Sequence, residues 1–400
     1  MNRDFRLLFA ASAVSRLGTS VSYVAMPLIA VTALHATPGE VGLLATLSTI
    51  AFLVIGLPAG AWTDRVRRRG VLIASDVARA VVLCSVPVAW WLGVLHIGQL
   101  YAVVLLCGVG TVFFDVANQS YVPQVVGRSA LLAANARLVS VDAVNDIAGR
   151  GVAGYLVALV TAPVAVLVDV ATYLVSAWCV LRVRHREPAP TRTDTALWRD
   201  MTEGIAFVAR HPVLRAIAMS GSLVNLGIVL IVTMLPVVLV DELRMSPALL
   251  GLFLATGGVG MLLGALVARR LADRVGAGRL SLLGALVAAP CGFGTPFVAE
   301  GPRMWLAGAG WVVLTAVVGA NNVLLVSFRQ AVTPDRLLGR MTASFRFLLT
   351  GALPVGAAAA GAIGEVASPR AALTAGAVAI ALVWVPILAS PLRKTRELDN

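Results

Sequence analysis

The sequence predicts an all-α membrane protein with twelve transmembrane helices in two pseudo-symmetric six-helix bundles. Three observations predict this fold class: a high apolar content, apolar runs of membrane length, and an internal repeat. Mean hydropathy is +0.89 and 13% of the residues are charged, whereas about a quarter of the residues of a soluble domain are charged. The apolar runs are about 20 residues long, the length of a helix that spans a bilayer. Buried strands of a soluble protein would give runs of roughly 4–8 residues, so the sequence excludes that class.

Twelve apolar runs define the expected spans. They cover residues 5–34, 39–62, 71–93, 99–118, 134–160, 163–182, 214–241, 247–268, 279–299, 303–326, 337–365 and 369–391. These spans divide the chain into an N-terminal bundle over 1–182, a polar cytoplasmic linker over 183–213, and a C-terminal bundle with a short cytoplasmic tail over 214–400. The last part of the linker, 196–210, has the pattern of an amphipathic helix that lies on the inner leaflet.

The two halves of the chain repeat at a constant offset of 209 residues. Seven identities pair Gly18, Pro27, Pro38, Gly42, Asp64, Arg65 and Val66 with Gly227, Pro236, Pro247, Gly251, Asp273, Arg274 and Val275. A parallel repeat of this kind relates two helix bundles by an axis along the membrane normal. The sequence therefore predicts two homologous bundles.

Basic residues are unevenly distributed among the loops. With both termini in the cytoplasm, 26 of the 32 Arg and Lys residues lie in cytoplasmic segments or at the adjoining ends of spans, and three, Arg244, Arg303 and Arg370, lie in outer loops or at the adjoining span ends. The other three, Arg16, Arg79 and Arg150, lie within spans. Basic residues concentrate on the cytoplasmic side of membrane proteins. The sequence thus predicts a multi-pass protein of the inner membrane with cytoplasmic termini. The net charge of +12 is assigned to this topology and to anionic lipid headgroups, and no nucleic-acid partner is expected.

The loop between the second and third expected helices carries the most specific motif. The signature Gly-x-Leu-Ala-Asp-Arg-x-Gly-Arg-Arg is matched at Gly60, Asp64, Arg65, Arg68 and Arg69. By this motif the chain resembles the major facilitator superfamily of transporters, although Trp62 and Arg67 depart from it. The segments 114–123, 168–177 and 203–212 are similar to the branch that contains enterobactin-type siderophore exporters and macrolide efflux proteins. The resemblance implies efflux across the cell membrane.

The chain shows no pattern of an enzyme. It has no nucleotide-hydrolysing P-loop, so transport is expected to use an ion gradient or the gradient of the substrate. We find no pairing of a nucleophile with a base and no cofactor motif. The four cysteines fall in apolar runs without metal-ligand spacing and read as packing residues. We therefore expect no cofactor and no metal.

Helix 5 of the expected fold holds the densest set of charged and amide residues within a span: Asp142, Asn145, Asp146 and Arg150. The spacing i, i+4, i+8 of the three charged residues predicts one stripe on the helix. One hypothesis is that Asp146 or Asp142 takes up a proton when Arg150 is pulled away, which couples protonation to conformation. The alternative is a static ion pair that holds helix 5 against its neighbours.

Arg16 in helix 1 is a second intramembrane cation, and such residues are costly and therefore suggest function. It either binds an anionic group of the substrate or pairs with a carboxylate of helix 5. The repeat-related residue of helix 7 is Asn225, and helix 10 adds Asn321 and Asn322. Ion coupling is therefore expected in the N-terminal bundle, while the C-terminal bundle shapes the substrate site.

A cytoplasmic gate is expected at the inner ends of helices 2, 3 and 4. Its residues are Asp64, Arg65, Arg68, Asp76, Arg79 and Asp115, with Asp273 and Arg274 as the repeat-related counterpart. The family resemblance implies that the loop aspartate, Asp64, helps to lock the two bundles in the outward-facing state. The alternative is that these arginines only set the topology, which does not explain why Asp64 and Asp273 recur at one offset.

The predicted function is export of an amphiphilic small molecule, such as a drug, macrolide or siderophore-like compound, by alternating access. Protons are the expected coupling ion, which makes the protein an antiporter, and membrane lipids are its other partners. Two alternatives stay open: a uniporter or importer of a small molecule, and a non-transporting lipid scramblase or sensor on the same scaffold. The acids of helix 5 distinguish the antiporter from a scramblase, because a scramblase needs a lipid-facing polar groove and no proton-coupled acid.

Overall fold

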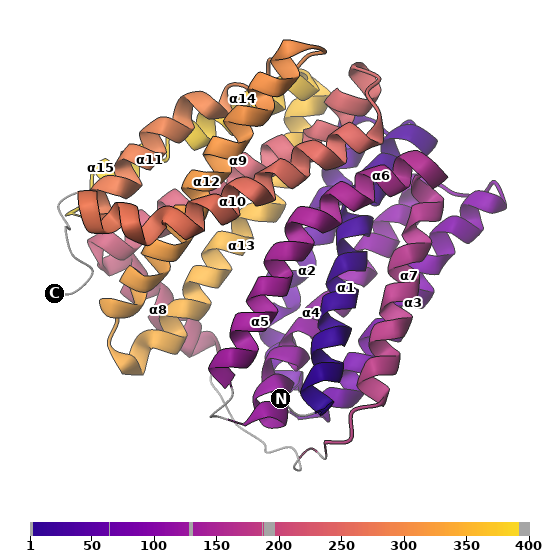
Figure 1. Cartoon of the computed structure of the whole chain (residues 1–400), viewed down its shortest axis with the longest axis horizontal. Helices are drawn as coiled ribbons and strands as arrows, with labels where there is room; N and C mark the ends of the chain where they lie inside the picture. The colour runs from indigo at the N-terminus through magenta and orange to yellow at the C-terminus, as the bar shows by residue number, and fades with distance from the viewer. Residues whose placement is uncertain (1–2, 64, 128–130, 186, 188–196, 392–400) are drawn as a thin grey trace. The chain divides into compact units, whose positions relative to one another are not determined.

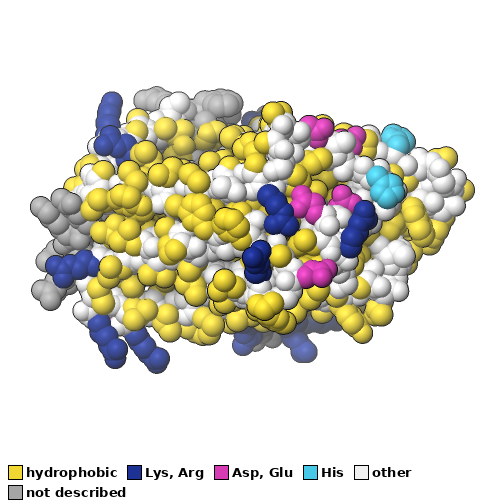
Figure 2. Space-filling view, turned by 90° about the horizontal axis from the view of Figure 1, so that it is seen from above, with side chains coloured by type: hydrophobic (Ala, Val, Ile, Leu, Met, Phe, Trp, Pro, Cys, Tyr) yellow, Lys and Arg dark blue, Asp and Glu magenta, His cyan; other side chains and the backbone are white. Residues whose placement is uncertain are grey.

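A computed structural model describes residues 3–63, 65–127, 131–185, 187 and 197–391. This part of the chain is almost entirely helical and contains no strand. Eleven of its helical segments are long and apolar enough to cross a membrane, and the shorter apolar helix α11 makes a twelfth. The fold class that the sequence predicts is therefore confirmed. Hydrophobic side chains cover most of the face drawn in Figure 2, which is the surface that lipid requires.

The chain divides into two compact units. Unit 1 comprises residues 1–36, 43–195 and 244–255, and unit 2 comprises residues 37–42, 196–243 and 256–400. The expected division into bundles at residues 182 and 214 stays a prediction. In chain order up to the linker, the helices are α1 (Arg3–Leu28), η1 (Ile29–Ala33), α2 (Pro38–Thr63), α3 (Arg68–Trp91), α4 (Ile97–Val126), α5 (Leu131–Val144), η3 (Asn145–Gly149), α6 (Arg150–Val160) and α7 (Ala162–Leu181).

After the linker, the chain again forms a series of long apolar helices (Figure 1). They are α8 (Leu197–Arg210), α9 (Pro212–Pro236), η4 (Val237–Glu242), α10 (Pro247–Val275), α11 (Ala277–Gly292), α12 (Pro302–Ala331), α13 (Asp335–Val366), α14 (Pro369–Ala381) and α15 (Trp384–Leu388). Helix α8 matches the amphipathic helix expected in the linker. It packs on α9 and α13 within unit 2, where Arg340 Nη1 lies 2.5 Å from Glu203 Oε2.

The 209-residue repeat is visible in the backbone. Helix α1 contains Pro27 and continues into the π-helix η1, and α9 ends at Pro236 and continues into the π-helix η4. Proline removes a backbone donor and disturbs the hydrogen bonds of the turn before it, and a π turn is one way to relieve that disturbance. Both repeats thus end their first long helix with the same irregular turn.

Within unit 1, α1 packs along α7, and α7 also packs along α3. Figure 1 shows α1, α5 and α7 running alongside one another. A buried cluster near the start of α1 and α3 and the end of α4 and α7 includes Phe5, Leu8, Leu72, Tyr121 and Val180. This packing fixes the spacing between α1 and its neighbours, and α1 carries most of the polar contacts described below.

Glycines let α10 and α12 approach at backbone distance within unit 2. A Cβ atom added at Gly264 would lie 1.8 Å from the carbonyl oxygen of Ala316, and one added at Gly319 would lie 2.0 Å from that of Met261. Membrane helices commonly use small residues in this way, because apolar side chains gain nothing over lipid. The glycines at these positions are therefore required by packing.

We predict that Gly264→Ala destabilises the protein, because the new methyl group would push α10 away from α12. Overpacking of this kind costs about 1–3 kcal/mol. The matched control is Gly308→Ala in α12, where a Cβ atom would meet nothing within 4 Å and alanine favours the helix. Thermal unfolding in detergent measures both variants. Equal melting temperatures would contradict the proposed close approach.

Candidate functional site

The charged part of helix 5 lies on an irregular turn. The helix expected over 134–160 is observed as α5, the π-helix η3 and α6, and η3 begins at Asn145 and contains Asp146. Single π turns inside α-helices occur frequently at functional sites. Of Asp146, only the backbone position is described.

The π turn is tied to α1 by hydrogen bonds. Asn145 Nδ2 donates to the carbonyl oxygen of Ala13 at 3.0 Å. The Ser20 hydroxyl lies 3.4 Å from the carbonyl oxygen of Asn145, and Gly149 packs against Ser20, since a Cβ atom there would lie 2.7 Å from Ser20 Cβ. Helix α1 thus contacts the irregular turn through the Ala13 carbonyl oxygen, which accepts from the Asn145 side chain, and through Ser20, whose hydroxyl also lies 3.1 Å from the carbonyl oxygen of Arg16.

Arg16 connects three helices of unit 1. Its Nε atom lies 2.8 Å from Asp142 Oδ1 on α5, and its Nη2 atom lies 3.6 Å from Asp115 Oδ1 on α4. The Arg16 and Asp142 side chains are 45% and 41% exposed. Arg16 lies about 20 Å along α1 at 1.5 Å per residue, which is near the middle of the span Arg3–Ala33. We call Arg16, Asp115 and Asp142 the Arg16 network.

The Arg16 network corrects two expectations. Asp115 was expected with Asp76 and Arg79 at the cytoplasmic gate, but its carboxylate faces Arg16. The charges of helix 5 were expected to form one straight stripe, but η3 interrupts the α-helical spacing between Asp142 and Arg150. The Arg150 guanidinium lies over the Tyr23 ring, 5.3 Å from its centre. Of the two roles considered for Arg16, the pairing with a helix 5 carboxylate is the one observed.

The repeat-related residue in unit 2 makes the corresponding link without charge. Asn225 on α9 donates from Nδ2 to the carbonyl oxygen of Leu349 on α13 at 2.8 Å. Arg16 and Asn225 are 209 residues apart, and each joins the first long helix of its repeat to the helix expected fifth. The contact is conserved between the repeats while its chemistry differs, which places the charge in unit 1.

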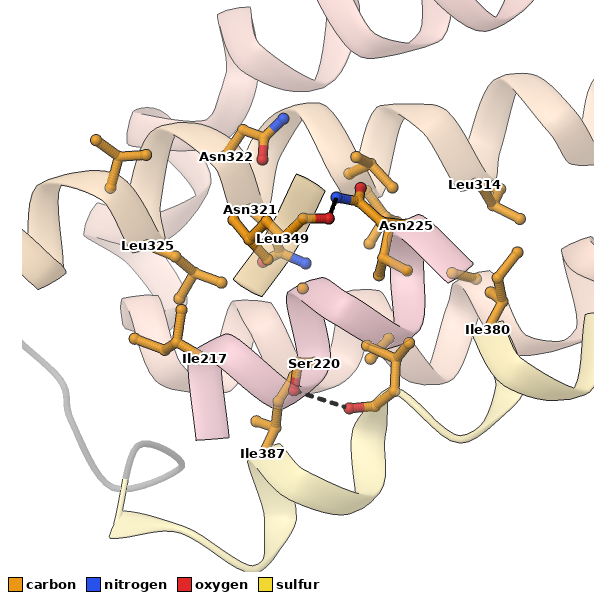
Figure 3. Close-up of a pocket in the computed structure, with 18 of the residues that line it drawn as sticks. Ile217, Ser220, Asn225, Leu314, Asn321, Asn322, Leu325, Leu349, Ile380 and Ile387 are labelled. Atoms are coloured by element: carbon orange, nitrogen blue, oxygen red, sulfur yellow. Dashed lines mark hydrogen bonds between the residues drawn. The ribbon is translucent and has the colours of Figure 1, made fainter. Parts of the chain in front are cut away.

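Asn225 lines a cavity inside unit 2, together with the two asparagines of α12 (Figure 3). The cavity encloses about 120 Å³ and its wall is mostly apolar, with Ile217, Leu314, Leu325 and Ile380 among the residues that form it. Asn321 and Asn322 contribute amide groups, and the Ser220 hydroxyl donates to the carbonyl oxygen of Val383 at 3.3 Å. An apolar wall with a few polar groups is typical of small-molecule sites.

Arg329 lines this cavity, although it lies beyond the expected tenth span, 303–326. Helix α12 continues to Ala331, five residues beyond the expected end at 326, and Arg329 therefore lies on the helix and lines the cavity. Its guanidinium lies 4.3 Å from the centre of the Phe345 ring on α13.

The residues expected at the cytoplasmic gate are described one by one within each unit. Asp64 lies outside the described residues, Arg65 is exposed, and Asp273 and Arg274 are exposed near the end of α10. The backbone N–H groups of Arg68 and Arg69 both donate to the Glu187 carboxylate at 2.7 Å. Glu187 therefore satisfies the free donors at the start of α3, a role that the sequence analysis did not assign.

Asp76 and Arg79 are a further correction, because they form a pair inside unit 1 and not at its cytoplasmic surface. Arg79 Nη2 lies 2.5 Å from Asp76 Oδ1, and both side chains are at most 2% exposed. Sequence reasoning also missed Asp169 on α7, which is fully buried. Its place in a long apolar run was the signal that could have identified it, since acids are rare in such segments.

The described residues contain no cluster of three or more His, Cys, Asp or Glu side chains that could hold a metal ion. The polar groups of the site described above are ion pairs, amides and hydroxyls within membrane-length helices. Such groups can bind a polar part of a small molecule or exchange a proton.

Comparisons with known proteins agree with this geometry. A family model described as a transmembrane secretion effector, of the major facilitator type, matches residues 1–400. The chain belongs to the major facilitator superfamily. It is 27% identical to the multidrug efflux pump Tap of Mycolicibacterium fortuitum over 98% of this chain and 96% of that protein. It is 26% identical to the enterobactin exporter EntS of Escherichia coli over 96% of this chain and 91% of that protein.

The fold matches solved transporters as well. A bacterial homologue of the iron transporter ferroportin has a TM-score of 0.77, with 16% identity over 97% of this chain and 98% of that chain. The expected superfamily is therefore confirmed, as is the expectation that the protein is a transporter and not an enzyme. At this identity the structural likeness shows the fold alone.

We predict that Asp142→Asn lowers stability more than Asp115→Asn, which serves as its matched control. The reason is the shorter distance from Arg16 to Asp142, 2.8 Å against 3.6 Å, because a close ion pair with a hydrogen bond is the stronger one. Since both groups are partly exposed, the difference should be about 1 kcal/mol or less. Thermal unfolding in detergent measures it, and a larger effect of Asp115→Asn would contradict the geometry.

Proposed function

We propose that this transporter exports an amphiphilic small molecule across the inner membrane in exchange for protons. The observation that supports the proposal is the Arg16 network. Its closest ion pair, Arg16 with Asp142, is about half exposed, and Arg16 lies near the middle of a membrane span. A charged residue at the centre of a membrane helix costs about 2.5–3.5 kcal/mol on insertion scales. A link that serves packing alone needs no charge, because the uncharged Asn225 makes the corresponding contact in the other repeat.

The Arg16–Asp142 contact supports an exchange mechanism based on alternating partners. While Asp142 faces Arg16, the carboxylate is balanced and needs no proton. If α1 moves relative to α5, the carboxylate loses its cation, and in a medium of low dielectric constant a proton then replaces it. Asp146, on the π turn that follows Asp142, is the second candidate for this proton. The helix 5 acids thus remain the proposed coupling residues, with Arg16 as the partner of Asp142.

The cavity of unit 2 supports an amphiphilic substrate. Its apolar wall favours hydrophobic parts of a ligand, and Asn225, Asn321 and Asn322 offer amide donors and acceptors. The matched efflux proteins support export as the direction. The arginine distribution supports cytoplasmic termini, and we retain Asp64, Arg65, Asp273 and Arg274 as the proposed gate.

We predict that a substrate triggers proton movement in proteoliposomes, and that Asp142→Asn or Asp146→Asn abolishes it while binding is kept. A pH-sensitive dye inside the vesicles reports the protons, and the probes are a macrolide, a catechol siderophore and tetraphenylphosphonium. Glu300→Gln is the control, because this carboxylate is exposed in a loop. Probe movement without proton flux in the wild type would show a facilitator. Lipid movement without probe movement would show a scramblase.

We also predict that Asn321→Leu weakens binding of the probe that has hydrogen-bonding groups by roughly 5–10-fold, which corresponds to one lost hydrogen bond of about 1–1.5 kcal/mol. Binding of tetraphenylphosphonium should change little, since that cation forms no hydrogen bonds. Equilibrium binding to the purified protein measures both. An equal loss for both probes would indicate a general packing defect and would contradict a specific role of the amide.

A further inference from the structure

A second group of charges lies in unit 1, apart from the Arg16 network. It consists of Asp76 and Arg79 on α3 and Asp169 on α7, with exposed fractions of 0%, 2% and 0%. We call these three residues the buried triad. The triad is built between α1, α3, α4 and α7, and the proposed function uses none of its members.

Arg79, the cation of the triad, has polar and aromatic contacts around its guanidinium group. Arg79 Nη2 contacts Asp76 Oδ1, and Nη1 donates to the Thr111 hydroxyl on α4 at 3.2 Å. The guanidinium lies between two rings, 4.2 Å from the centre of Tyr173 and 4.8 Å from that of Phe114. Gly110 makes room for the side chain, because a Cβ atom there would lie 2.7 Å from Arg79 Cγ. Arg79 thus has a fixed position beside Asp76.

Asp169 is held by hydroxyl groups. Its Oδ2 atom contacts the Ser22 hydroxyl on α1, and its Oδ1 atom lies 3.3 Å from Thr172 Oγ1. The absence of a side chain at Gly18 permits this contact between α1 and α7, since a Cβ atom there would lie 2.4 Å from Asp169 Oδ1. Within the described residues, no Lys, Arg or His forms an ion pair with Asp169, although Arg79 is close enough to act on it electrostatically.

The charges of the triad do not balance. Two carboxyl groups share one guanidinium, and the other titratable groups close to Asp169 and Arg79, Tyr173 and Cys107, are neutral in their ordinary form. An uncompensated carboxylate without access to water costs several kcal/mol. A bound proton on one carboxyl group removes that cost. Because Asp76 is the acid in contact with Arg79, Asp169 is the acid left over.

The hydroxyl groups around Asp169 indicate the same position for the proton. Thr172 Oγ1 lies 2.8 Å from the carbonyl oxygen of Asp169, which can only accept, so the hydroxyl proton of Thr172 is used there. Thr19 likewise donates to the carbonyl oxygen of Ser15 at 2.9 Å, so Tyr173 is the donor in its 3.1 Å contact with Thr19. An ionised Asp169 accepts from the Ser22 hydroxyl, and the Tyr173 hydroxyl, which also contacts Thr19, is its other donor, whereas a protonated Asp169 can in addition donate to Thr172.

We propose that Asp169 is a proton-binding site that holds a proton as a neutral carboxylic acid while Asp76 and Arg79 form the ion pair of the triad. The carboxylate takes its proton from hydronium and leaves a water molecule, release is the reverse step, and no other bond is made or broken. The site is separate from the helix 5 acids and needs no substrate in order to be occupied.

Helix α1 connects this proton site to the Arg16 network. Ser22 and Arg16 are six residues apart on α1, which is about 9 Å along the axis. Any shift of α1 that separates Arg16 from Asp142 therefore also moves Ser22 relative to Asp169. The inference that the Asp169 proton takes part in coupling rests on the proposed function, whereas proton binding at Asp169 does not.

Infrared spectroscopy of the purified full chain in lipid tests proton binding directly. A protonated carboxyl group gives a carbonyl band that shifts in D₂O, and the proposal expects such a band at neutral pH. Asp169→Asn should remove it. Asp76→Asn should remove it as well, although Asp169 is still present, because Asp169 then becomes the counter-ion of Arg79. Arg79→Gln should increase the band, because both acids are then without a cation.

The control is Glu300→Gln, an exposed loop carboxylate outside both groups of charges, which should leave the band assigned to Asp169 in place. Variants that elute as a single species on size exclusion are compared, and the opposite changes expected for Asp76→Asn and Arg79→Gln distinguish the proposal from a general packing defect. A wild-type spectrum without the band, or a band that is unchanged in both Asp169→Asn and Asp76→Asn, would overturn it. If no triad variant folds, the presence or absence of the band in the wild-type spectrum still tests the proposal.

The coupling role has its own measurement. In the proteoliposome assay with tetraphenylphosphonium, Asp169→Asn should abolish probe-triggered proton flux and keep probe binding. Full flux in that variant would overturn the coupling role. If the wild type shows no flux, the proposed antiport fails while the infrared result stands, so the two failures are distinguishable.

Discussion

A charge inside a membrane-length helix must be balanced where it lies, because neither lipid nor the apolar interior can solvate it. In this protein that constraint determines which helices must stay together in unit 1. Arg16 holds α1 to α4 and α5, and the pair of Asp76 and Arg79 contacts α4 through Thr111. Helix α1 takes part in both groups of charges, through Arg16 and through Ser22. The position of α1 therefore affects the packing of the helices and, in the proposed mechanism, the protonation of the acids in unit 1.

The two repeats solve the same packing problem with different chemistry. Each ends its first long helix in a π turn after a proline, and each joins that helix to the helix expected fifth by a polar contact. In unit 1 the contact is an ion pair, and in unit 2 it is an amide that donates to a backbone carbonyl. An amide does not gain or lose a charge by protonation near neutral pH, so the proposed function assigns the cavity of unit 2 to ligand recognition. This division of roles is what the proposed antiport requires.

Much of the fold follows from the sequence because its signals are local. The lengths of the apolar runs predicted the membrane helices, and the 209-residue offset predicted a repeat that the π-helices η1 and η4 display. Asn225, Asn321 and Asn322 were expected near one substrate site because they lie in spans of one half, and they line one cavity. Pairing of Arg16 with a helix 5 carboxylate was one of the two roles predicted for it, whereas its second partner, Asp115 on α4, was not predicted.

The errors have a common physical cause, which is that side-chain direction depends on irregular turns and helix lengths. The π turn η3 breaks the spacing on which the helix 5 stripe was based, and the longer α12 brings Arg329 into the cavity. Asp76 and Arg79 were assigned to a surface gate because they follow a cytoplasmic loop, yet their helix carries them into the interior. Asp169 was read as part of a family segment, and only the packing of α1 on α7 shows what it contacts.

Transport against a gradient is the most direct measurement of the central claim, which is that the charges of unit 1 couple a proton to export. Proteoliposomes hold equal concentrations of a transported probe inside and outside, the membrane potential is clamped, and a pH gradient is imposed. The account predicts net probe movement from the alkaline to the acidic compartment, which stops when an ionophore removes the pH gradient and is absent from protein-free vesicles. A probe that equilibrates across the membrane but is never concentrated by the pH gradient would contradict it.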